Sequence, residues 1–211
     1  MADPFEGARF VGLLLAGSGL VGALLVGTSA FVSPAIWNGP EDVALRLIAR
    51  HRLIWRTANV GFALATVMTA AGLFVLPGEV GERGASLALA AAVTFALAGT
   101  LWLITLSIRL AVTPGVASGF ASDGTVDPVF PPLARLGGAT YVAFIFIGGA
   151  AMVTLGAAIL IGGSITALVG WASVAIGLLI VGGYLVFGDM LPAFVYFPTT
   201  ILGIALLFAT G

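Results

Sequence analysis

Long apolar runs, separated by short polar or proline-containing segments, cover most of the chain. Within each run the apolar residues are continuous and do not alternate with polar ones, which favours helices over the strands of a membrane barrel. A helix needs about 20 mostly apolar residues to cross a bilayer. Six stretches reach this length, at residues 10–31, 57–76, 85–110, 136–161, 166–187 and 191–210. The pattern predicts an all-α integral membrane fold, with residues 1–211 in a single bundle of about six transmembrane helices.

The last of these stretches contains two prolines. Pro192 would lie in the first helical turn, where a missing N–H is tolerated, with Asp189 as the N-cap. Pro198 would lie inside the helix and kink it. The alternative is therefore five spans followed by a re-entrant C-terminal segment.

The connections between the stretches differ in length. Residues 162–165, Gly-Gly-Ser-Ile, form a tight turn, so we expect the fourth and fifth spans to be antiparallel neighbours. The longest connection is residues 113–135, whose glycine, proline, serine and aspartate content predicts a long irregular loop. Asp123 and Asp127 in this loop lack the spacing of a calcium-binding loop.

A basic segment, RLIARHRLIWR at residues 46–56, precedes the second stretch and contains four arginines and the single histidine. Pro40 and two acids after it fit a helix start, and the apolar residues that follow fall on one face. We therefore predict an amphipathic juxtamembrane helix over residues 41–56. No breaker separates it from the second span, and the combined helix over residues 41–76 would be about 54 Å long. It would either project from the membrane or bend near residues 55–59 and lie in the interface.

The composition narrows the class of protein. The chain is 60% hydrophobic and only 8% charged, whereas an ordinary globular domain is about 25% charged. These values are typical of an integral membrane protein. A net charge of −1 argues against nucleic acid as a partner. The absence of lysine excludes a retinal Schiff base, and the absence of cysteine excludes disulfides and thiolate metal sites.

The arginines are distributed unevenly between the two ends of the predicted spans. Arg9 and Arg83 fall on the N-terminal side, and the other six arginines fall on the opposite side. Arginine is enriched in cytoplasmic loops, so both termini are predicted to lie outside and the side with Arg46–Arg56 to be cytoplasmic. The N-terminus lacks the basic region of a cleaved signal peptide, and we interpret the first span as retained. The predicted location is the bacterial inner (cytoplasmic) membrane.

The basic segment is the first candidate site. Each basic residue beside an anionic leaflet contributes about 1 kcal/mol, so four arginines would give about 4 kcal/mol. That attraction is enough to orient the helix, which is the simpler interpretation. The sharper hypothesis is a lipid-headgroup or partner-subunit contact whose affinity His51 tunes with pH. The residues concerned are Arg46, Arg50, His51, Arg52 and Arg56.

A second candidate is a polar site formed by Arg109, Tyr184 and Asp189. Asp189 follows Gly188 at the junction of the fifth and sixth stretches, where it could bind a proton or cation with Tyr184 or Tyr196. The simpler interpretation is a helix cap. Arg109 lies near the end of the third stretch, where an arginine ordinarily extends its guanidinium towards the interface.

The chemistry needed for catalysis is scarce. The sequence contains no HExxH, GxSxG or P-loop motif, and one histidine cannot form a two-histidine metal or haem site. We therefore predict no catalytic residue, no metal site and no cofactor, and hence no enzyme. Pigments, quinones and lipids bind between helices without a motif, so the sequence leaves them open.

The C-terminal stretch GWASVAIGLLIVGGYLVFGDMLPAFVYFP, residues 170–198, resembles the last spans of uncharacterised multi-pass membrane proteins of GC-rich bacteria. In those proteins Gly-Trp opens a span and a proline-containing segment closes the chain. The resemblance covers about a fifth of the sequence. It implies a membrane bundle and no activity, and it transfers no functional residue.

Small residues recur every four positions in several spans, as at Gly19, Ala23 and Gly27. Such stripes let helices approach closely, either inside one bundle, which we favour, or in an oligomer. Together with the missing chemistry, they favour a non-catalytic accessory or scaffold subunit that packs against lipids, other membrane subunits or further copies of itself. The alternative is a small-solute or lipid transporter with a site near Asp189, because broken helices form such sites.

Overall fold

The computed structural model describes residues 4–32 and 35–209, and every regular element in these ranges is helical. This confirms the predicted all-α class. The elements are α1 (Pro4–Val32), α2 (Ala35–Asn38), α3 (Glu41–Arg50), α4 (Arg52–Val75), η1 (Leu76–Gly78), α5 (Glu82–Ala111), α6 (Thr113–Asp123), α7 (Phe130–Gly162), α8 (Ala167–Phe187), η2 (Pro192–Tyr196) and α9 (Phe197–Ala209).

Five helical segments in the described ranges are long and apolar enough to cross a membrane. They are Gly7–Leu24, Arg52–Gly78, Glu82–Asp123, Phe130–Gly162 and Ala167–Phe187. A shorter apolar segment, Pro192–Phe208, follows them. Its η2 turn begins at Pro192, and α9 begins only at Phe197. Pro198 thus lies in the first turn of α9, where a missing N–H is tolerated, and the predicted interior kink is wrong.

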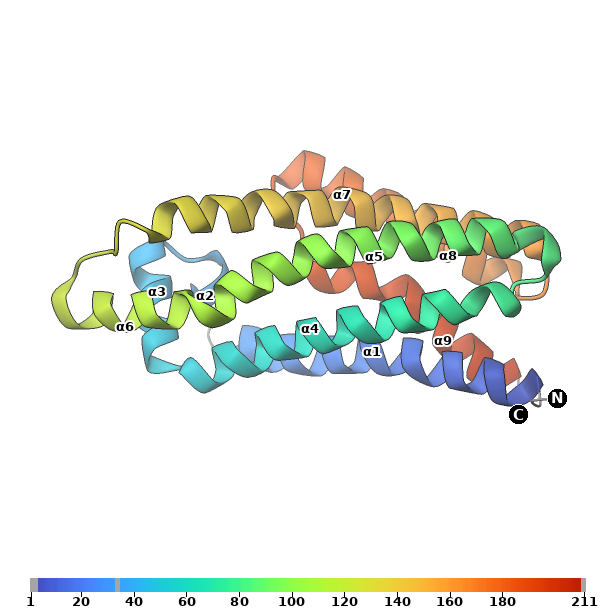
Figure 1. Cartoon of the computed structure of the whole chain (residues 1–211), viewed down its shortest axis with the longest axis horizontal. Coiled ribbons are helices and arrows are strands. Elements are labelled where there is room, and N and C mark those ends of the chain that lie inside the picture. Colours follow the sequence, from blue (N-terminus) through green and yellow to red (C-terminus); the bar gives the residue numbers. More distant parts are fainter. Residues whose placement is uncertain (1–3, 33–34, 210–211) are drawn as a thin grey trace.

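The long helices run side by side along one axis (Figure 1). Helix α5 packs extensively against α7, α7 against α8, and α1 against both α4 and α9. Helices α7 and α8 are antiparallel neighbours, as the tight turn after Gly162 predicts. The beginning of α1 and the end of α9 lie at the same end of the bundle (Figure 1). Helices α2 and α3 lie across the opposite end, beside α6, and we call this the capped end.

The predicted helix over residues 41–56 is divided at His51. Helix α3 ends at Arg50, His51 has φ −117° and ψ 41°, and α4 begins at Arg52. The bend therefore lies before Trp55, earlier than predicted. It lets α3 bury Leu45 and Ile48 against α6 and α7 while α4 enters the bundle.

The predicted irregular loop over residues 113–135 is largely helical, which corrects that prediction. Pro114 lies in the first turn of α6, where it needs no N–H partner. Gly124 ends α6 with φ 75°, a conformation that glycine adopts without strain. The apolar residues of α6 pack on α3, so tertiary contacts stabilise a segment whose local composition resembles a loop. Only residues 124–129 connect α6 to α7.

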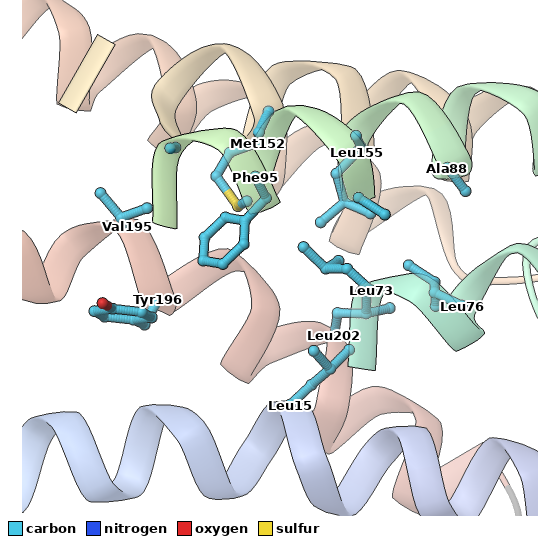
Figure 2. Close-up of a cluster of buried hydrophobic side chains, with 14 of the residues drawn as sticks. Leu15, Leu73, Leu76, Ala88, Phe95, Met152, Leu155, Val195, Tyr196 and Leu202 are labelled. Carbon is cyan, nitrogen blue, oxygen red and sulfur yellow. The ribbon is translucent and has the colours of Figure 1, made fainter. Parts of the chain in front are cut away.

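The core is a continuous apolar cluster that involves all the long helices (Figure 2). Small residues bring α7 and α8 into backbone contact: a Cβ added at Gly156 would lie 2.5 Å from the Gly170 carbonyl oxygen. Gly203 of α9 similarly lies against the backbone of α1 at Ala16. These glycines are used for packing within the bundle. The central side chains drawn in Figure 2 include Leu15, Leu73, Phe95, Met152, Leu155, Val195, Tyr196 and Leu202.

Candidate binding sites at the capped end

A cavity of about 270 Å³ lies at the capped end between α3, α5 and α7. Most of its lining is apolar. Thr105, Arg109 and Thr113 contribute polar atoms from α5 and α6, Tyr141 contributes one from α7, and Glu41 lies at the start of α3. The apolar lining residues are Ile36, Ala44, Leu45, Ile48, Trp55, Ile108, Phe130 and Ala134.

Arg109 is the cation of this cavity, and aromatic rings flank its guanidinium. The guanidinium carbon lies 5.6 Å from the centroid of the Trp37 ring and 5.2 Å from that of Trp102. Such cation–π contacts stabilise by about 1 kcal/mol each. In the part of the chain that the structure describes, the guanidinium has no hydrogen bond and no ion pair. The structure thus places the Arg109 guanidinium over two indole rings beside the cavity.

Hydrogen bonding and stacking hold this group in place. The Trp55 Nε1–H donates to the main-chain oxygen of Arg109 at 2.7 Å, and the Trp55 ring stacks on Trp37 with centroids 5.1 Å apart. The Trp102 ring stacks on Phe144 at 5.1 Å with an interplanar angle of 13°. Helices α2, α4, α5 and α7 thus all fix the surroundings of one cation.

Two buried indole N–H groups belong to the rings beside the cation. Within the described residues, Trp37 Nε1, Trp102 Nε1 and the side-chain oxygen of Asn59 form no hydrogen bond of ordinary geometry. Buried polar atoms without partners are uncommon in folded proteins. The Asn59 amide nitrogen donates to the Trp55 carbonyl oxygen at 2.7 Å, so Asn59 packs on the same turn of α4. Within the described residues, the surroundings of Arg109 therefore combine a cation that forms no ion pair with the buried indole N–H of Trp37.

Tyr141 connects the cavity with Asp189. Its hydroxyl donates to the Met190 carbonyl oxygen and lies 3.1 Å from Asp189 Oδ1. Asp189 also accepts a hydrogen bond from the Met190 N–H at 2.8 Å. The N-cap of η2 is Leu191, so Asp189 orders the preceding turn instead of capping the helix.

The predicted polar site is thus brought together only in part. Arg109 and Tyr141 line the same cavity, and the Tyr141 hydroxyl contacts Asp189. Tyr184 instead packs against Phe146, with ring centroids 5.6 Å apart. The sequence reasoning missed Tyr141 and the tryptophans. The spacing of Trp102 and Arg109, seven residues apart on one helical face, was a usable signal for the cation–π contact.

The structure divides the predicted headgroup cluster. Arg46 lies over the Phe120 ring, 5.0 Å from its centroid, and Arg50 is exposed. His51 occupies the bend between α3 and α4. Arg52 and Arg56 are exposed on α4 and line a second, open hollow of about 580 Å³ between α4 and the end of α5. The rest of its lining is Leu53, Val60, Leu110, Ala111 and Pro114.

The aspartates between α6 and α7 are used in local turns. Asp123 Oδ1 accepts hydrogen bonds from the N–H and the hydroxyl of Thr125, both at 2.9 Å. Asp127 Oδ1 accepts one from the Val129 N–H, also at 2.9 Å. Across residues 4–32 and 35–209, no group of three histidines or carboxylates is arranged to hold a metal ion.

Comparison with known proteins gives no relative: no protein family, no curated protein and no solved structure matches the chain. The resemblance of residues 170–198 to bacterial multi-pass membrane proteins stays a prediction. What the chain binds is therefore argued from the geometry of its own side chains.

Proposed function

We propose that the chain is a non-catalytic integral membrane subunit that packs against lipids and other membrane proteins. The observation that carries this proposal is the open hollow at Arg52 and Arg56. Two arginines one helical turn apart lie above apolar residues at the same helix–helix groove. This arrangement complements an anionic phospholipid: the arginines would pair with its headgroup, and the apolar residues would contact its acyl chains.

The charges of the hollow support an anionic occupant. Its described lining contains two arginines and no carboxylate. A basic residue near an anionic leaflet contributes about 1 kcal/mol, so the pair would contribute about 2 kcal/mol. Val60 and Leu110 lie next to the arginines and would contact the upper part of an acyl chain.

The same reasoning favours a bundle embedded in the bacterial inner membrane with its capped end in the cytoplasm. Arg46, Arg50, Arg52, Arg56 and Arg135 are exposed at that end. Cytoplasmic loops are enriched in arginine, which would place the beginning of α1 and the end of α9 outside. The segment Pro192–Phe208 runs back towards the beginning of α1 (Figure 1). At about 1.5 Å per residue it would form a short sixth crossing of about 25 Å.

The test is lipid retention. The protein is extracted from bacterial membranes in mild detergent, and bound phosphatidylglycerol is counted by native mass spectrometry. We expect the double variant Arg52→Gln/Arg56→Gln to lose the bound lipid. Arg83→Gln, an exposed arginine at the start of α5, is the matched control and should retain it. Equal retention by both variants would remove the support for this contact.

Partner proteins provide the second part of the test. Chemical cross-linking in native membranes, followed by mass spectrometry, should join the chain to another membrane protein or to a second copy. Recovery of the cross-linked chain only as a monomer would contradict a scaffold role.

The alternative is a transporter for small solutes or lipids with a site near Asp189. The contact of Tyr141 with both the cavity and Asp189 favours it. Solute flux into proteoliposomes should then fall in Asp189→Asn. Flux that is unchanged in this variant would reject the version that depends on Asp189.

A further inference from the structure

We propose that the cavity between α3, α5 and α7 binds a small carboxylate with an apolar body, and that the Arg109 guanidinium is its counter-ion. This inference goes beyond the lipid contact at Arg52 and Arg56. The two hollows have no lining residue in common, so either proposal can fail without the other.

The first argument is the unpaired cation. An arginine side chain carries five N–H donors. Within residues 4–32 and 35–209, the guanidinium of Arg109 meets the faces of two indole rings and no carboxylate or carbonyl acceptor. Aromatic faces attract the charge but leave the N–H groups in the ring plane of the guanidinium without strong acceptors. These donors are free to meet an acceptor in the adjoining cavity.

The second argument is that the cation is held before any ligand arrives. The main chain at Arg109 is fixed by the Trp55 Nε1–H, and Trp102 is backed by Phe144. A ligand group that meets a positioned guanidinium loses less conformational entropy than one that must order a mobile side chain. The arrangement resembles a built recognition site more than a solvent-exposed arginine.

The charges near the cavity favour a ligand with one negative charge over a ligand with two. Arg109 is the only cation among the described lining residues, and Glu41 lies in the same lining. Asp189 adds negative charge behind Tyr141. The Arg109 guanidinium can pair with one negative charge, and the second charge of a phosphate would face these carboxylates without a cation. The planar guanidinium matches the two oxygens of a carboxylate, which carries one charge.

The remaining lining selects the body of the ligand. Ile36, Ile48, Ile108 and Phe130 come from four different helices and give the cavity an apolar lining beside the cation. The volume of about 270 Å³ is just below the roughly 300–1,000 Å³ of ordinary small-molecule pockets. It suits one short alkyl chain or one ring, and a two-chain phospholipid is too large for it.

The experiment measures octanoate binding in nanodiscs of zwitterionic phosphatidylcholine. Trp37, Trp55 and Trp102 adjoin the cavity, so their fluorescence reports occupancy. The fourth tryptophan, Trp171, is exposed on α8 outside the lining, and Trp171→Phe removes its background. We expect saturable octanoate binding, and an affinity at least tenfold lower in Arg109→Gln. Neutral 1-octanol should bind the parent protein and Arg109→Gln alike.

A second variant keeps the proposal testable if Arg109→Gln does not fold. Gly138 lines the cavity, and a Cβ placed on it meets no atom within 4 Å. Gly138→Leu should therefore fold, retain Arg109 and lose octanoate binding because its side chain occupies the space. Arg56→Gln, from the lipid hollow, should bind octanoate with unchanged affinity.

Three outcomes would overturn the proposal. They are octanoate affinity unchanged in Arg109→Gln, octanoate affinity unchanged in Gly138→Leu, and tighter binding of octyl phosphate than of octanoate by the parent protein. The last would assign the cavity to phosphate. Loss of phosphatidylglycerol in Arg52→Gln/Arg56→Gln with normal octanoate binding would support two separate sites.

Discussion

The two ends of the bundle are closed by different means. At the end opposite the cap, the start of α5 and the end of α7 meet through glycine: a Cβ on Gly84 would lie 2.3 Å from the Ala158 carbonyl oxygen. Backbone contacts bring the two helices close together at this end. At the capped end, α3 and α6 are held by large side chains such as Trp55 and Phe120, and a cavity remains. Glycine contacts bring backbones together at one end, whereas the large aromatic side chains at the capped end leave a cavity beside polar groups.

The largest effect is expected when a glycine is replaced by leucine at the end opposite the cap, and the same replacement at the capped end is the control. Gly84→Leu should lower the free energy of unfolding by about 3 kcal/mol, because the new side chain must displace the α7 backbone. Gly138→Leu at the capped end meets open space and should change it by less than about 0.5 kcal/mol. Unfolding in mixed micelles titrated with dodecyl sulfate measures both. Similar losses in the two variants would contradict the difference between the ends.

A smaller effect is expected in the centre of the bundle, between the two ends. The Tyr196 hydroxyl is buried and forms a 2.7 Å hydrogen bond with Thr66. Tyr196→Phe should cost about 1 kcal/mol, within the range measured for hydrogen bonds in membrane interiors. Tyr184→Phe is the control, since the Tyr184 ring packs at the surface of the core. The same micelle titration would detect the difference, and equal losses would argue against a special role for the buried hydroxyl.

Tyr141→Phe should cost about 0.6 kcal/mol by removing the contacts with Met190 and Asp189. The stronger readout is local. Hydrogen exchange at residues 188–191 should accelerate, because the turn loses its only side-chain hydrogen bonds to α7 among the described residues. Exchange that stays as slow as in the parent protein would show that the turn is held by η2 alone.

The smallest effect concerns the contact between α3 and α6. Arg46→Gln should cost about 0.5 kcal/mol, the value of an exposed cation–π contact with Phe120. Arg50→Gln, also exposed and on the same helix, removes an equal charge without such a contact and should cost less. Thermal unfolding followed by tryptophan fluorescence compares the two, and a reversed order would rule out the Phe120 contact as a source of stability.

The sequence predicts much of the fold because hydropathy is a local property that determines which helices can lie in lipid. Prediction from the sequence fails at residues 113–135 and at His51, where contacts between α3 and α6 decide the structure. The residues of the candidate site likewise divide into those that the sequence indicates and those that only the packing reveals. Arg109 and Asp189 stand out as charges in an apolar chain, whereas Tyr141 is an ordinary helical residue until α7 packs beside α5 and η2. Which charge lies near which ring depends on helix packing that no local pattern specifies.

The bend at His51 has a mechanical consequence. A single residue separates α3, which forms one wall of the interior cavity, from Arg52, which faces the outer hollow. Helix α3 is thus joined to α4 through one residue that lies next to the exposed Arg52. A movement of α3 that widened the cavity would turn the backbone at His51, and it would thereby change the position of α3 relative to Arg52 and the outer hollow.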